Sequence, residues 1–290
     1  MVPAIFAFIA IAYALGIALS LVVGLTGGAS SPLAGLGYLA MFIPAAAVIV
    51  LRLTFGERLR ADWRRFPIAF LPFALFLIPA ALHGAMLPEA ARQEGRLFLQ
   101  AWLAPDESGL FHTPPERGWG TIPAAMLAIR IARDAIAGLV AASALVFFEE
   151  VGWRAWLLPR LAARLDARAA VLVAAFAWAL WHVPFALAGI HHIDGASAVR
   201  VAISVPLANV GIGLVLGWLW MKTRSIWMVT IAHGAVNDWG QYAFEYLDDF
   251  TRADPIQVLD AGGRAVLLLG MALVILALPP GKPLVPPADV

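Results

Sequence analysis

The chain has 290 residues, of which 62% are hydrophobic and 13% are charged, and its formal net charge is +1. Soluble domains carry about 25% charged residues, so this composition argues against an ordinary water-soluble protein. The small net charge gives no basis for nucleic-acid binding. The chain has no cysteine, which excludes disulfides and thiolate metal sites.

Eight segments are long and apolar enough to cross a bilayer, whose hydrocarbon core needs about 20 helical residues. They are 4–26, 36–53, 67–87, 134–158, 169–190, 199–221, 226–246 and 263–279. The uncharged opening stretch, which ends at Arg52, is interpreted as membrane spans and not as a cleaved signal peptide. No segment predicts a strand. We therefore expect an all-α membrane protein, a single polytopic domain over 1–290 with eight transmembrane helices, and a disordered Pro-rich tail over about 280–290.

Basic residues predict the orientation of these spans. They gather in three connections, 52–65, 160–168 and 222–224. With eight spans, all three lie on one side, which the positive-inside rule makes the cytoplasmic side. Both termini are then cytoplasmic. The Ala- and Arg-rich composition suggests a bacterial source, and hence the inner membrane.

Polar and ionisable side chains inside spans are costly and tend to be functional. Three spans carry them: Glu149, Glu150 and Arg154 in the fourth, His182 in the fifth, and His233, Asn237 and Asp238 in the seventh. At 1.5 Å per residue from the basic loops, Glu150, His182 and His233 lie at depths of roughly 15, 21 and 14 Å. A lone buried histidine or ion pair is often structural, but three spans that agree in depth indicate a shared site within about 134–246.

The two adjacent carboxylates are predicted to have different roles. Glu150 and Arg154 are four residues apart on one helix face, with the acid first, which is the favoured order for an ion pair. Glu149 is rotated about 100° away and lacks such a partner. We therefore expect Glu150 to be a structural anchor and Glu149 to be the base that takes a proton from water.

His233 and Asn237 are also four residues apart, so both can present hydrogen-bond donors on one helix face. Two aligned donors can stabilise an oxyanion. Asp238 is rotated off this face and is expected to be a polar neighbour.

These residues resemble the motifs of the CPBP family of intramembrane proteases (CAAX protease and bacteriocin-processing, also called Abi). Glu149-Glu150-Val151-Gly152-Trp153-Arg154 fits the family's EExxxR motif. The segment from Phe176 to His182 resembles its FxxxH motif, although Trp178 stands where the family has phenylalanine. His233 and Asn237 match the third motif, a histidine and an asparagine four residues apart.

The resemblance implies eight transmembrane helices around a membrane-embedded, water-filled cavity. It implies that Glu149 and His182 activate water, that His233 and Asn237 form the oxyanion site, and that Glu150 pairs with Arg154. Members of the family have been described as metal-dependent and as metal-free glutamate proteases. Glu149, His182 and His233 could supply a zinc site, but the helical HExxH pattern of zincins is absent, and water activation without a cofactor is preferred.

The predicted function is an intramembrane endopeptidase that hydrolyses a peptide bond near the cytoplasmic side. Its partners would be the lipid bilayer and a peptide or membrane-protein substrate; no residue pattern indicates a prenyl group. A proton-coupled transporter is one alternative, since such proteins use carboxylate and histidine relays, but paired repeats are not seen. A catalytically silent membrane scaffold or immunity protein is the other.

Overall fold

The computed structural model describes residues 2–59, 62–94, 101–191, 193, 195–246 and 254–281. The first part contains α1 (Val2–Leu25), η1 (Gly28–Ser30), η2 (Ala34–Phe42), α2 (Ile43–Phe55), η3 (Ile68–Phe70), η4 (Phe73–Leu77), α3 (Ile78–Gly84), α4 (Leu87–Glu94), η5 (Ala101–Leu103), β1 (Leu110–His112), η6 (Pro115–Arg117) and β2 (Thr121–Pro123). The second part contains α5 (Ala124–Glu150), η7 (Val151–Leu157), α6 (Leu158–Ala162), α7 (Ala167–Trp181), α8 (Val183–Leu187), α9 (Ala198–Thr223), α10 (Ile226–Tyr246) and α12 (Pro255–Ala277).

The helical membrane architecture expected from the sequence is confirmed, but the count of eight spans is not. Among the described residues, seven helical segments are long and apolar enough to cross a membrane: Val2–Leu25, Ala34–Phe55, Ile68–Glu89, Ala124–Ala162, Ala167–Leu187, Ala198–Thr223 and Pro255–Ala277. The protein is therefore an integral, multi-pass membrane protein. The remaining expected span is α10, which is a helix of 21 residues. Its His233, Asn237 and Asp238 lower its hydropathy, although its length of about 31 Å matches a bilayer core.

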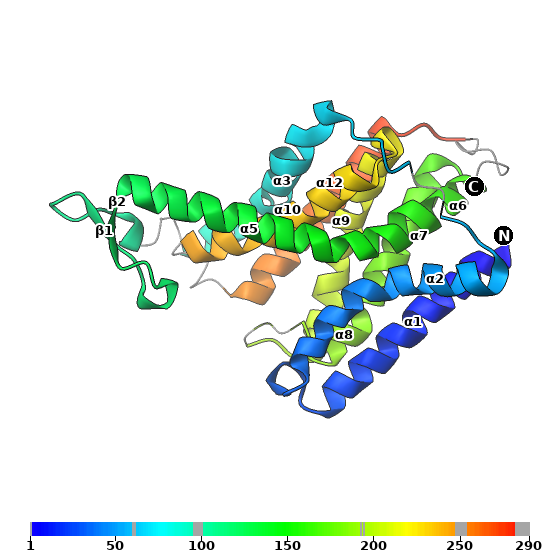
Figure 1. The fold of residues 1–290 in the computed structure, drawn as a ribbon, viewed down its shortest axis with the longest axis horizontal. Coiled ribbons are helices and arrows are strands. Elements are labelled where there is room, and N and C mark those ends of the chain that lie inside the picture. Colours follow the sequence, from blue (N-terminus) through cyan, green and yellow to red (C-terminus); the bar gives the residue numbers. More distant parts are fainter. Residues whose placement is uncertain are drawn as a thin grey trace.

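A short hairpin corrects the expectation that the chain has no strands. Strands β1 and β2 pair antiparallel, with Phe111 opposite Ile122. Each strand has three residues, too few for an alternating pattern to be recognised in the sequence. The hairpin immediately precedes α5, far along that helix from the carboxylates (Figure 1).

The three basic connections lie together at one end of the molecule, as the orientation argument requires. Arg160 donates hydrogen bonds to the Glu57 carboxylate (2.8 Å) and to the carbonyl oxygen of Arg58 (3.0 Å). The Trp227 indole, which follows the third basic connection, donates to the carbonyl oxygen of Trp63 (2.8 Å). Which face of a membrane this basic end meets stays a prediction. Of the predicted disordered tail, residues 282–290 lie outside the described part of the chain.

The opposite end is built by close packing of small residues. The connection from α1 to α2 lies against the end of α8 (Figure 1). A Cβ on Gly28 would approach the carbonyl oxygen of Ala188 within 2.7 Å, and one on Gly37 would approach the Ile190 side chain within 3.1 Å. Small residues allow membrane helices and their connections to approach closely. Here they bring the 28–42 segment over the residues that follow α7.

Candidate active site

The adjacent carboxylates lie where α5 becomes the π-helix η7. Glu149 and Glu150 are the last residues of α5, and the N–H of Leu158 bonds to the carbonyl oxygen of Trp153, five residues earlier. Such π-helical turns are rare and are frequent at functional sites. A Cβ on Gly152 would overlap Pro44, so η7 packs directly on the first turn of α2. This contact holds the end of α5 in place.

Glu150 is engaged by two partners, one of them the predicted Arg154. Its Oε1 accepts a hydrogen bond from Nη1 of Arg154 (2.8 Å) and contacts Nδ1 of His233 (2.8 Å). The carboxylate is fully buried, and the arginine and histidine are 2% and 3% exposed. A carboxylate only accepts, so Nδ1 of His233 carries a proton in this contact. Removing one partner from such a buried pair leaves an uncompensated charge, which fits the anchor role expected for Glu150.

Glu149 has a different environment. Its Oε2 accepts a hydrogen bond from the indole Nε1 of Trp178 (2.7 Å), which is a neutral donor. Its side chain is 2% exposed and forms part of a cavity wall. The two carboxylates therefore separate as predicted: one pairs with a cation, and the other borders open space.

His182 reaches the same cavity from the break between α7 and α8. Helix α7 ends at Trp181, and Pro184 lies in the first turn of α8; proline cannot donate the backbone hydrogen bond that would continue α7. The imidazole Nδ1 lies 2.9 Å from the carbonyl oxygen of Trp178. Since that oxygen only accepts, Nδ1 donates, and in the neutral ring Nε2 has the lone pair that can bind a water proton.

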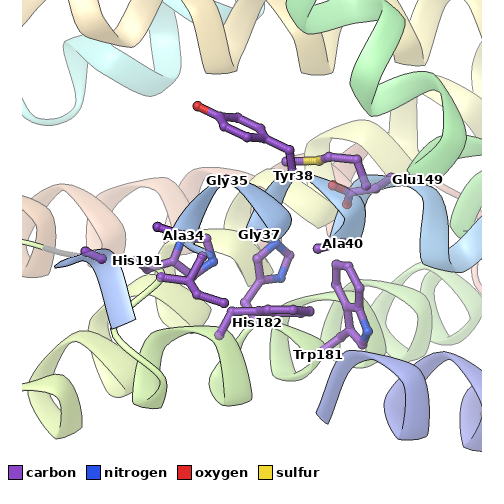
Figure 2. A pocket seen from close by; sticks show the side chains of 13 residues that line it. Ala34, Gly35, Gly37, Tyr38, Ala40, Glu149, Trp181, His182 and His191 are labelled. Atoms are coloured by element: carbon purple, nitrogen blue, oxygen red, sulfur yellow. The ribbon is translucent and has the colours of Figure 1, made fainter. Parts of the chain in front are cut away.

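The cavity has a volume of about 430 Å³ and a mostly apolar wall that combines small residues with large ones such as Trp181 and Phe185. Glu149 and His182 approach it from different helices, opposite the η2 segment (Figure 2). That segment contributes the small residues Ala34, Gly35, Gly37 and Ala40. The cavity thus lies on the side of the carboxylates that faces the small-residue end of the molecule, away from the basic end.

A second histidine in the cavity wall was not predicted as a site residue. The ring of His191 stacks on that of His182, with centroids 5.6 Å apart and an interplanar angle of 29°. Burial lowers the pKa of His191 to about 4. His191 lies in the connection that follows α8, and its neighbours His192 and Asp194 lie outside the described residues. The sequence feature that could have indicated His191 is its position shortly after the helix break at Pro184.

Helix α10 brings His233 to the carboxylates by packing tightly on α5. A Cβ on Gly234 would overlap Ser143, and one on Gly138 would overlap Asp238. Asp238 is thus a buried packing neighbour of α5, as expected. Asn237 is exposed, one turn beyond His233. His233 is in contact with Glu150, but neither His233 nor Asn237 is part of the cavity wall. The structure therefore does not bring these two residues together at the cavity.

The structure does not group the residues considered as zinc ligands. Within the described ranges, no three or more His, Cys, Asp or Glu side chains are arranged to hold a metal ion. Glu149, His182 and His233 instead each contact the indole of Trp178. Nδ1 of each histidine bonds a protein oxygen, which is also the usual arrangement in histidines that bind a metal ion through Nε2. Nε2 of each ring is therefore the atom that remains for a water molecule, a substrate or a metal ion.

Comparison with known proteins agrees with the motifs. No match was found among curated proteins. Residues 131–238 match the family model for type II CAAX prenyl endopeptidases, described as Rce1-like. This range is a little more than a third of the chain, and it contains all three motifs, from Glu149 to Asn237. This match agrees with the resemblance carried by the motifs: residues 131–238 are similar to the Rce1-like type II CAAX prenyl endopeptidases, which at family level are CAAX-protease-type intramembrane peptidases.

Proposed function

We propose that the protein is an intramembrane endopeptidase in which Glu149 and His182 activate a water molecule. The observation that supports this most directly is that these two side chains, from different membrane-crossing helices, border one cavity. A carboxylate and an imidazole that face shared space are the groups needed to take a proton from water at the reacting carbon.

In the proposed reaction, a water molecule between Glu149 and Nε2 of His182 attacks the carbonyl carbon of the peptide bond. The water oxygen forms the new bond to carbon, and its proton passes to the Glu149 carboxylate. When the carbon–nitrogen bond breaks, Glu149 returns this proton to the leaving amine. Both groups then regain their starting protonation states. Hydrolysis changes no oxidation state, so the reaction needs no redox partner. No metal takes part in this scheme.

His233 and Asn237 are the proposed oxyanion donors, and this role rests on the motif resemblance. Glu150 holds the His233 ring through Nδ1, which leaves Nε2 as the ring atom that would meet the substrate oxygen in this role. Asn237 is exposed and its amide can turn toward a bound substrate. Each donor to an oxyanion typically contributes a factor of about 10² to 10³ in rate.

The proposed substrate is an extended segment of a peptide or membrane protein. The cavity wall from the 29–41 segment is dominated by alanine and glycine, which leaves room for a substrate backbone. No described residue pattern selects a prenyl chain. We propose that the basic end faces the cytoplasm of a bacterial cell, with the N-terminus on that side. Because part of the cavity wall comes from the opposite end, we propose substrate access from the other face; cleavage near the cytoplasmic side, as expected from the sequence, stays a prediction.

The experiment is comparative peptide analysis of membranes that contain wild type, Glu149→Gln or Gly84→Ala. Glu149→Gln keeps the side-chain shape and removes the base. Gly84 has open space around it and serves as the matched control. Peptides present with wild type and Gly84→Ala but lost with Glu149→Gln support the proposal; identical peptides in all three refute it. Proton flux in proteoliposomes that Glu149→Gln abolishes would instead indicate a transporter, and a cellular phenotype that survives Glu149→Ala would indicate a scaffold.

A further inference from the structure

We propose that Trp178 is a positioning residue that orients Glu149 through its indole N–H. The proposal rests on the proposed function, because it concerns how that site is held. It also gives a role to the one position where the second motif departs from its family: a phenylalanine there has no hydrogen to donate.

Trp178 contacts the site from several directions. Its Nε1–H donates to Oε2 of Glu149 (2.7 Å), and its carbonyl oxygen accepts from Nδ1 of His182 (2.9 Å). The same indole meets the His233 ring edge to face, with centroids 5.2 Å apart. One residue of α7 therefore touches the proposed base and both histidines.

The ring face of Trp178 also carries the Arg154 guanidinium, whose central carbon lies 4.5 Å from the ring centroid. A cation over an indole face is held by the ring quadrupole. Arg154 is at the same time bonded to Glu150. The indole is consequently fixed between the ion pair and the proposed base, and it is only 2% exposed.

This placement determines which oxygen of Glu149 faces the water. With Oε2 bound to the indole, Oε1 is the oxygen available to the cavity, and rotation of the carboxylate would break a short bond. A phenylalanine at this position would fill most of the space but leave Glu149 without this donor. The bond should therefore affect the chemical step more than substrate binding.

Trp156 provides a matched comparison. It is a fully buried tryptophan that stacks on Phe8, and its Nε1 has no hydrogen-bond partner among the described residues. Trp156→Phe removes an indole N–H that bonds nothing, whereas Trp178→Phe removes one that bonds the base. The two substitutions cause a similar loss of buried volume, and their difference isolates the hydrogen bond.

The test measures kcat and KM of reconstituted protein on a peptide whose cleavage depends on Glu149. For Trp178→Phe we expect kcat to fall about 10- to 100-fold, the usual effect of losing a group that orients a reacting one. We expect KM to change by less than about twofold. Trp156→Phe should retain the wild-type kcat. Replacement of Trp178 by benzothienylalanine, in which sulfur takes the place of the N–H, keeps the ring size and should reproduce the loss if Trp178→Phe fails to fold.

A wild-type kcat in both Trp178 variants would overturn the inference, as would an equal loss of kcat in Trp156→Phe. These results differ from failure of the proposed function. If the proposed function fails, Glu149→Gln leaves all cleavage products unchanged. If only the inference fails, cleavage still requires Glu149 but its rate does not depend on the indole N–H of Trp178.

Discussion

Loss of the Arg154 side chain should destabilise the protein strongly. In Arg154→Leu, the fully buried Glu150 keeps only His233 as a hydrogen-bonding partner. Breaking a buried ion pair by removing one partner costs about 3–5 kcal/mol. At about 2 °C per kcal/mol for a chain of this length, the melting temperature should fall by about 6–10 °C.

The assay is thermal unfolding in detergent, with a surface pair on α5 as the control. Arg133 is bonded to Asp134, and their side chains are 57% and 34% exposed. Exposed pairs contribute about 0–1 kcal/mol, so Arg133→Leu should shift the melting temperature by no more than about 2 °C.

A double-mutant cycle tests the cause of the loss. Combining Arg154→Leu with Glu150→Gln removes the unpaired charge, so the double variant should be more stable than the sum of the single losses predicts, by about 0.5–3 kcal/mol. Equal melting temperatures for Arg154→Leu and Arg133→Leu, or additive single losses, would refute the reasoning.

Three further predictions follow from packing, access and chemistry. Gly234→Ala should lower the free energy of unfolding by about 1–3 kcal/mol, because the new Cβ would push α10 away from Ser143. Gly84→Ala should leave the stability unchanged, and equal melting temperatures for the two variants would contradict this packing. The chain has no cysteine, so a single Gly35→Cys in the cavity wall and a single Lys222→Cys at the basic end can each be labelled with an impermeant maleimide. We expect the two variants to react from opposite sides of sealed vesicles. Labelling of both from the same side would show that the cavity opens toward the basic end. Strong zinc chelators should leave peptide cleavage unchanged, and restoration of lost activity by added zinc would reverse the metal-free proposal.

The local chemistry of the carboxylates was predictable because it depends on helical spacing. Glu150 and Arg154 are four residues apart, and the ion pair forms even though Arg154 lies in a π-helical segment. Similar depth in three spans predicted that groups from α5, α7 and α10 would meet. The shared contacts at Trp178 bear out that proximity for Glu149 and the two histidines, and Glu150 joins them through its contact with His233.

Other parts of the site depend on packing between distant segments, which spacing does not encode. The η2 segment covers the cavity because Gly28 and Gly37 permit a close approach to residues 188–190. His191 stacks on His182 only because the chain turns after Pro184. The hydrogen bond from Trp178 was also not predictable from the sequence. An aromatic residue in a span usually packs against its neighbours, and donation from the indole N–H requires a particular ring orientation.

The difference between the two carboxylates follows from the charge of their partners. Ionisable groups within a membrane require compensation, and Glu150 obtains it from a cation that is itself buried. Protonating Glu150 would therefore leave Arg154 without its counterion, at a cost of several kcal/mol. Glu149 receives a hydrogen bond from a neutral indole, so a gain or loss of a proton there breaks no direct ion pair like the one between Glu150 and Arg154. The adjacent acids therefore differ in their environment: Glu150 is held in a buried ion pair, and Glu149 is the one proposed to change its charge during the reaction.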